Sequence, residues 1–170
     1  EAQRIGVEPG AVRDLAASLP KDRFEIKILT GGGDLHWLSN RISPFFLVND
    51  WLAVLELAAA FRRERPDIIH LNSSKAGVLG SLAAFIYNSA MRPFGTPKAK
   101  VVFTAHGWVF NPANHPPLMV RRTYALLHRA AGFFQDAIIN VSKVDYEIAM
   151  RYRIAPPQKL CTIHNGIDSN

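Results

Sequence analysis

Short apolar runs alternate with longer helical stretches along most of this chain. Five runs rich in β-branched residues have the length of strands, and they are 24–29, 67–71, 101–105, 137–141 and 159–163. Most of them are apolar at nearly every position, which is typical of parallel strands that are covered on both faces. The pattern therefore predicts a parallel sheet.

Helical stretches fill the spaces between these strands. They are 51–64, 76–87, 118–134 and a stretch that begins at Ser142. Asn49 or Asp50 is expected to cap the first of them, and Pro66 ends it. In the last of them, Asp145 follows Ser142 by three residues, much as in a capping box.

The alternation of strands and helices predicts the topology and the place of a site. It implies right-handed crossovers and a Rossmann-like, doubly wound parallel α/β sheet, and 170 residues fit a single domain. In such a sheet, ligands bind at the carboxyl ends of the strands. The loops expected to form a site are therefore 31–34, 72–77, 106–111, 142–145 and 165–168.

The loop at 71–77 has the most suggestive chemistry. Ser73, Ser74, Lys75 and Gly77 stand between a strand and a helix, where hydroxyls, a cation and a helix N-terminus can hold an anion or a sugar. The spacing differs from that of a Walker A loop. The alternative interpretation is simple capping of the helix by Ser73 or Ser74.

Among the histidines, His106 is the best candidate for contact with a ligand. It ends a predicted strand and precedes Gly107, so that its ring and backbone can face the crevice; the alternative is a packing role. His70 lies inside a strand and is predicted to be a packed core residue. No two histidines have the i, i+4 spacing of a helical metal site. The glycines at 31–33 lack the spacing of a dinucleotide site and indicate a flexible turn.

Composition narrows the class of protein. With 48% hydrophobic and 20% charged residues, the chain can bury a core. No apolar run reaches the roughly 18–20 residues that span a bilayer. Cys161 is the single cysteine, which excludes an internal disulfide framework and a cysteine-based zinc site. Nothing indicates a secretory leader, and a reducing cytosol is expected.

The net charge of +6 is unevenly distributed. Residues 1–85 hold ten basic and ten acidic side chains, whereas residues 86–170 hold ten basic and four acidic ones. The excess suggests an anionic partner, and the alternative is a solvated basic surface. Arg121, Arg122, His128 and Arg129 are expected to form a basic stripe on one helix. Nucleic acid is not expected, because the nearby aromatics belong to apolar patterns instead of forming stacking platforms.

Four segments, in this order and spacing, resemble a known family. They are PDIIHLNSSKAGVLGSLAA (66–84), VVFTAHGWVFN (101–111), DAIINVSKVDYEIA (136–149) and KLCTIHNGID (159–168). With residues 19–32 they span most of 11–168. The chain resembles the N-terminal domain of GT4-type glycosyltransferases of the GT-B fold, especially bacterial enzymes of exopolysaccharide and lipid-linked glycan synthesis.

The resemblance implies a division of labour between two Rossmann-like domains. The N-terminal domain binds the acceptor and the C-terminal domain binds a nucleotide sugar. Transfer of a hexosyl unit retains the anomeric configuration and needs neither a metal nor another cofactor. The expected partners are the nucleotide sugar, a lipid-linked or polysaccharide acceptor, and an anionic membrane surface on the cytoplasmic side.

The resemblance also implies roles for individual residues. His106 would lie near the donor sugar as the catalytic residue. The loop from Ser73 to Gly77 would border the acceptor, and the segment from Asn165 to Asp168 would lead toward the second domain. The expected substrate-binding residues are Ser73, Ser74, Lys75, Gly77, Gly107, Ser142, Asn165 and Gly166.

Departures from the family leave alternatives open. Residues 1–170 are expected to be one domain truncated at both ends, which lacks the family's first strand and C-terminal domain and is inactive by itself. A UDP-sugar 2-epimerase shares the architecture, but it would need acidic and histidine acid–base groups in the cleft. A non-enzymatic alternative is a stand-alone basic α/β module that docks on anionic surfaces.

Overall fold

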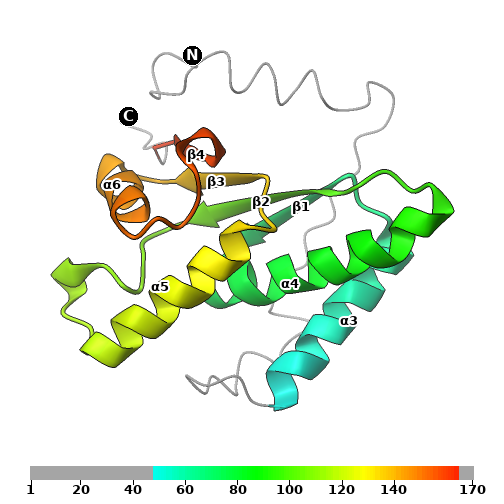
Figure 1. Cartoon of the computed structure of the whole chain (residues 1–170), viewed down its shortest axis with the longest axis horizontal. Coiled ribbons are helices and arrows are strands. Elements are labelled where there is room, and N and C mark those ends of the chain that lie inside the picture. Colours follow the sequence, from blue (N-terminus) through cyan, green and yellow to red (C-terminus); the bar gives the residue numbers. More distant parts are fainter. Residues whose placement is uncertain (1–47, 165–170) are drawn as a thin grey trace, which may run out of the picture.

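The computed structural model describes residues 48–164 and shows four parallel strands that alternate with helices (Figure 1). The elements are α3 (Val48–Glu64), β1 (Ile68–Asn72), α4 (Ser74–Met91), β2 (Lys100–Ala105), α5 (Leu118–Gly132), β3 (Ala137–Asn140), α6 (Lys143–Arg151) and β4 (Leu160–Thr162). Short 3₁₀ turns occupy Arg92–Phe94, Pro112–Asn114 and Pro157–Lys159. Within this range, the predicted strands and helices are confirmed. The predicted strand at 24–29 lies outside the described residues.

The sheet has the order β1-β2-β3-β4, and every neighbouring pair is parallel. Figure 1 shows α3, α4 and α5 side by side below this sheet, with α6 near β3 and β4. The predicted parallel α/β fold is confirmed. Double winding would also need the strand predicted at 24–29. That strand belongs to the part of the chain that the structure does not describe.

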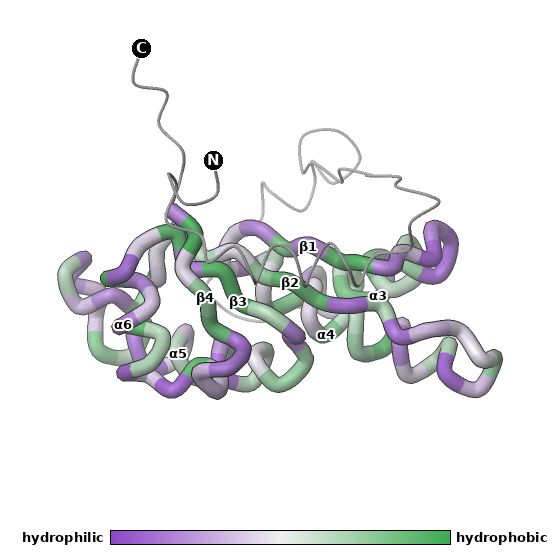
Figure 2. The backbone as a smooth tube through the Cα atoms, turned by 90° about the horizontal axis from the view of Figure 1, so that it is seen from above, coloured by the Kyte–Doolittle hydropathy of each residue, from purple (hydrophilic) through white to green (hydrophobic). Residues whose placement is uncertain are grey.

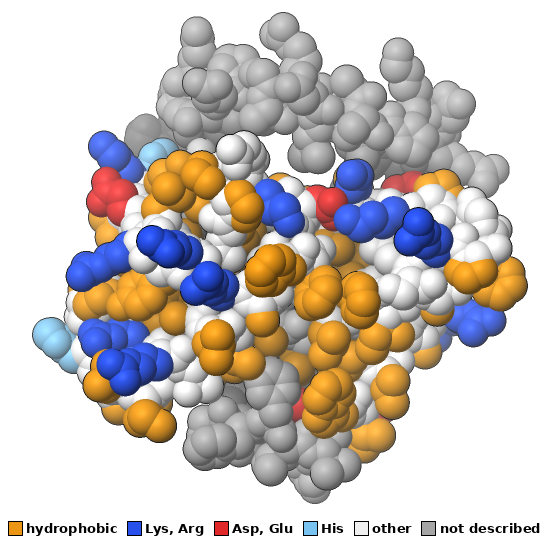
Figure 3. Space-filling view, in the orientation of Figure 1, with side chains coloured by type: hydrophobic (Ala, Val, Ile, Leu, Met, Phe, Trp, Pro, Cys, Tyr) orange, Lys and Arg blue, Asp and Glu red, His pale blue; other side chains and the backbone are white. Residues whose placement is uncertain are grey.

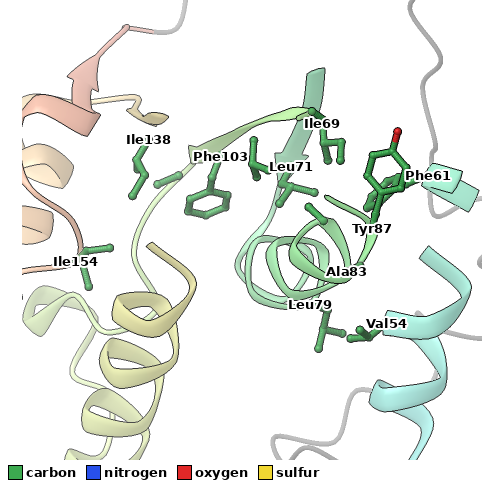
Figure 4. Packing of buried hydrophobic residues seen from close by; sticks show 14 of the residues in the cluster. Val54, Phe61, Ile69, Leu71, Leu79, Ala83, Tyr87, Phe103, Ile138 and Ile154 are labelled. Carbon is green, nitrogen blue, oxygen red and sulfur yellow. The ribbon is translucent and has the colours of Figure 1, made fainter. Parts of the chain in front are cut away.

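Alternate strand residues form the core between the sheet and the helices. Ile69 and Leu71 of β1 point to the same side as Phe103 of β2 (Figure 4). Helix α4 approaches them closely at Gly80, next to Leu71, and at Gly77, next to Phe103. The hydropathy colouring of Figure 2 shows the same apolar character along β2, β3 and β4. Burial of a side chain the size of leucine contributes about 1.5–3 kcal/mol, so this layer holds the strands in register.

The N-terminus of α3 differs from the prediction. The helix already includes Val48, so Asn49 and Asp50 lie in its first turn and neither is its N-cap. Asp50 instead is buried and pairs with Lys75. The C-terminus is as predicted, because Arg65 has a left-handed φ of 48° and Pro66 follows it.

Candidate active site

Three loops meet at the carboxyl edge of the sheet. They follow β1, β2 and β3, and these strands are parallel neighbours, so their carboxyl ends lie at one edge. The loops begin at Ser73, His106 and Val141. The predicted loops at 31–34 and 165–168, with Asn165 and Gly166, lie outside the described residues.

Two hydrogen bonds run diagonally from β1 to the chain of β2 on one face of the sheet. His70 is in register with Val102 but contacts Thr104, with 2.8 Å between Nε2 and Oγ1. Asn72 is in register with Thr104 but contacts His106, with 3.2 Å between Oδ1 and Nε2. Each bond therefore reaches two residues beyond the registered partner, and the second one brings the first two loops together.

His70 is not the packed core residue that was predicted. It alternates with the buried Ile69 and Leu71, so its side chain lies on the opposite face of β1 and is exposed. Partial burial of the ring lowers the pKa of His70, and the nearby His106 lowers this pKa further. The prediction failed because a strand in an α/β sheet can have one face less covered than the other.

Ser73 has a backbone conformation that is uncommon for a residue with a side chain. Its φ is 80° and its ψ is 149°, in a region that glycine occupies almost exclusively. It occupies the N-cap position of α4, but its side chain makes no capping hydrogen bond. Ser74 is the first residue of the helix. Capping by a Ser73 hydroxyl is therefore wrong, and the exposed Ser73 side chain faces solvent beside the His106–Asn72 contact.

Lys75 is paired with an acidic side chain of the neighbouring helix. Its Nζ lies 2.7 Å from Oδ1 of Asp50, whose side chain is largely buried, while the Lys75 side chain is partly exposed. The pair joins the first turn of α4 to α3. The positive charge that was expected to hold substrate is therefore already balanced by a carboxylate.

Gly77 lies inside the interface between α4 and the sheet. A Cβ atom at this position would stand 2.5 Å from the Phe103 ring, so any larger residue would displace the ring or the helix. Its carbonyl accepts a hydrogen bond from the buried Gln135 side chain. The structure thus provides a packing reason for glycine at this predicted substrate-binding position.

The loop after β2 is held by Trp108. Gly107 has a φ of 129°, and the chain then turns inward so that Trp108 is buried. Its indole Nε1 donates to the carbonyl of Asp145 at 2.9 Å and to Oδ1 of Asn140 at 3.3 Å. These bonds tie the His106 loop to the start of α6.

Ser142 is the N-cap of α6, as predicted. Its Oγ accepts a hydrogen bond from the Asp145 backbone N–H at 3.0 Å and donates to the Asp145 carboxylate at 2.6 Å. The hydroxyl donor is thus engaged within the protein. A role in substrate binding would require this hydroxyl to leave the Asp145 carboxylate or to accept a further hydrogen bond.

His128 is buried below the site and does not belong to a basic surface stripe. Its ring stacks on Phe103 with centroids 5.5 Å apart and meets the edge of Trp108 at 5.2 Å. Nε2 has no hydrogen-bond partner, and burial lowers its pKa to about 4. The prediction of a basic stripe of four residues is therefore wrong for His128. This side chain faces the core, whereas Arg122 and Arg129 are exposed.

The sequence of this chain matches a known protein family. The family model described as Glycosyltransferase Family 4 matches residues 11–170. The chain belongs to glycosyltransferase family 4.

One curated relative of this family 4 chain has a defined activity. It is the UDP-Gal:alpha-D-GlcNAc-diphosphoundecaprenol alpha-1,3-galactosyltransferase of Escherichia coli, which is 29% identical over 161 residues. The match covers 88% of this chain and 39% of the relative. The chain thus spans about two fifths of the length of the relative that it matches.

Several residues that shape this family 4 site were not singled out from the sequence. Asn72 was inside a predicted loop, but nothing in its spacing indicated the diagonal contact with His106. Trp108 and Asn140 support the site from the core. The sequence did offer one indication of this support. Trp108 follows His106 by two residues, and a tryptophan buried there needs an acceptor for its indole N–H.

Within residues 48–164, no group of three or more His, Cys, Asp and Glu side chains is arranged to hold a metal ion. No helix in that same part of the chain is both long and apolar enough to cross a bilayer.

Proposed function

We propose that this chain forms the acceptor-binding half of a retaining glycosyltransferase, which moves a hexosyl unit from a nucleotide sugar to a lipid-linked or polysaccharide acceptor. The main observation is the junction of the loops after β1 and β2, where His106 contacts Asn72 beside the N-terminus of α4. Membership of the family and the printed activity of the curated relative support this class of reaction.

Each part of the junction has a proposed task. The exposed His106 ring orients the donor sugar, and the hydroxyls of Ser73 and Ser74 hydrogen-bond the acceptor. The N-terminal end of α4 carries partial positive charge, which favours the diphosphate of a lipid-linked acceptor. Gly107 lets the backbone approach the sugar closely, since no Cβ is present.

The proposed transfer needs no metal and no general base from this chain. The bond between the anomeric carbon and the donor diphosphate breaks while a bond to the acceptor oxygen forms on the same face. The departing diphosphate takes the acceptor proton, and a second domain binds the nucleotide and stabilises the charge that develops on the leaving group. His106 therefore has an orienting role in this scheme.

We also propose that the enzyme works on the cytoplasmic face of an anionic membrane. Met119, Arg122, Leu126 and Arg129 of α5 and Phe133 at its C-cap recur at intervals of three and four residues, and all five are exposed. We call these five residues the α5 stripe. Figure 3 shows basic and apolar side chains intermingled with few acidic ones on one face of the molecule. Apolar groups interleaved with arginine favour the interface of an anionic bilayer.

Transfer can be tested with the full-length protein. We expect label from one of a panel of nucleotide sugars to appear in N-acetylglucosaminyl-diphosphoundecaprenol or a related lipid-linked acceptor, with an α linkage by NMR from an α-configured donor. An inverted linkage would overturn the retaining mechanism. A UDP-sugar epimerised at C2 without transfer would favour the epimerase alternative, and vesicle binding with neither activity would favour the non-enzymatic module.

A further inference from the structure

Asn72 is placed to control the ring of His106. Its side chain is exposed on the open face of β1, and its Oδ1 lies 3.2 Å from His106 Nε2. The backbone on both sides of this contact is fixed, by the pairing of β1 with β2 up to Asn72 and Thr104 and by the turn at Ser73. The amide therefore presents an acceptor from a rigid position.

We propose that Asn72 is the positioning residue of His106, an inference that rests on the proposed function of this site. The amide oxygen accepts from Nε2–H, so the neutral ring carries its proton on Nε2 and leaves Nδ1 as a hydrogen-bond acceptor. An acceptor nitrogen selects a sugar hydroxyl that donates. Asn72 thus decides both the direction in which the ring points and the polarity of its contact with the donor sugar.

The neighbouring diagonal pair offers a matched control. His70 and Thr104 make the same kind of contact two residues earlier on the same strands, at 2.8 Å. Thr104→Val removes that contact with little change of shape. If Asn72 acts through His106 specifically, only the Asn72 variant changes the state of the His106 ring.

The first test is independent of turnover. In the substrate-free full-length protein labelled with ¹⁵N-histidine, we expect His106 to show a single rotamer with the proton on Nε2. In Asn72→Leu, the ring is expected to sample several rotamers and both tautomers, whereas Thr104→Val and Asn72→Asp, which retains an acceptor, keep the ordered state. An unchanged His106 ring in Asn72→Leu would overturn the proposal, even if transfer activity fell.

The second test uses donor analogues in which each sugar hydroxyl is replaced in turn by hydrogen or fluorine. At one position, we expect both replacements to lower kcat/KM about tenfold in the wild-type and Thr104→Val enzymes, because fluorine cannot donate. In Asn72→Leu the sensitivity to that position should disappear. The contrary result is that fluorine restores activity at every position where replacement of the hydroxyl by hydrogen lowers it. That result would overturn the assignment of Nδ1 as an acceptor. Absence of transfer from every natural donor would instead overturn the proposed function, and the NMR test would still decide whether Asn72 positions the ring.

Discussion

Lys75 and Asp50 form an ion pair that joins the first turn of α4, beside the site, to the neighbouring helix α3, with 2.7 Å between Nζ and Oδ1. The side chain of Asp50 is 11% exposed and that of Lys75 is 33% exposed, so water screens the pair only in part. The start of α4 therefore takes its position from α3 as well as from the sheet.

Removing either partner of this pair should destabilise the protein. We expect Asp50→Asn and Lys75→Met each to lower the free energy of unfolding by about 1–2 kcal/mol, because the other charge is left poorly solvated. The double variant should lose less than the sum of the two, as measured by urea denaturation. Lys98→Met is the control, since Lys98 pairs with Asp136 at a more exposed position and should cost less than about 1 kcal/mol. Additive effects of Asp50→Asn and Lys75→Met would show that the two charges do not interact.

Ser73 and Ser74 should respond differently to replacement by glycine. Ser73→Gly is expected to raise the free energy of unfolding by about 1 kcal/mol, because Ser73 has a φ of 80° that glycine adopts without strain. Ser74→Gly places glycine in the first turn of α4 and should be neutral or destabilising by up to about 1 kcal/mol. Equal effects at the two positions, measured by thermal unfolding, would contradict a strained turn at Ser73.

His128 should make stability depend on pH. Burial lowers its pKa in the folded state from 6.5 to about 4, so the unfolded chain binds more protons between these values. Stability is therefore lost as the pH falls from 6.5 toward 4, by about 3 kcal/mol in total. His128→Phe retains an aromatic ring among Phe103, Trp108 and Phe110 and should flatten this dependence.

Denaturation of the wild type and of His128→Phe at several pH values measures how their free energies of unfolding differ. The titration of other groups contributes equally to both proteins and cancels in this difference. His115→Asn is the control, because His115 is exposed in a left-handed turn that asparagine tolerates. A His128→Phe variant with the slope of the wild type would show that folding leaves the pKa of His128 unchanged.

Periodicity predicted the described strands and helices because each strand is a short apolar run with a clear turn on either side. It also located the loop that contains His106, since the carboxyl edge follows from topology. It could not place the side chains of that edge. Whether Asn72 meets His106 depends on the register of β1 with β2, and the charge of Lys75 is balanced by Asp50, which is distant in sequence.

Helical spacing likewise could not show which way a mixed face points. His128 has the same seven-residue relation to Arg121 as Arg129 has to Arg122, yet His128 packs among aromatic rings and Arg129 is exposed. Neutral histidine is readily buried whereas arginine is rarely buried, and this difference decides the orientation. Their spacing and basic character alone do not distinguish the two residues.

The α5 stripe should control binding to vesicles. We expect the full-length protein to co-sediment with anionic vesicles and to be released by salt, which screens charge. Arg129→Gln should weaken binding about fivefold, in line with about 1 kcal/mol for a basic residue near the surface. Leu126→Ser should weaken it as well, because Leu126 is 68% exposed and available for insertion.

Lys100→Gln is the matched control for the loss of one charge, because Lys100 lies at the start of β2 and outside the stripe. It should bind like the wild type. Binding that is independent of salt and of anionic lipid, or equal losses in Lys100→Gln and Arg129→Gln, would argue against docking through α5.

The most direct test of the proposed site is the activity and stability of His106→Ala in the full-length enzyme. His106 is exposed and its side chain contacts Asn72, so its loss should leave the melting temperature nearly unchanged. Because one preorganised hydrogen bond near the reacting centre is removed, kcat is expected to fall about a hundredfold. His115→Asn should retain wild-type turnover. A His106→Ala enzyme that unfolds, or that transfers sugar at the wild-type rate, would contradict the assignment of His106 to the site.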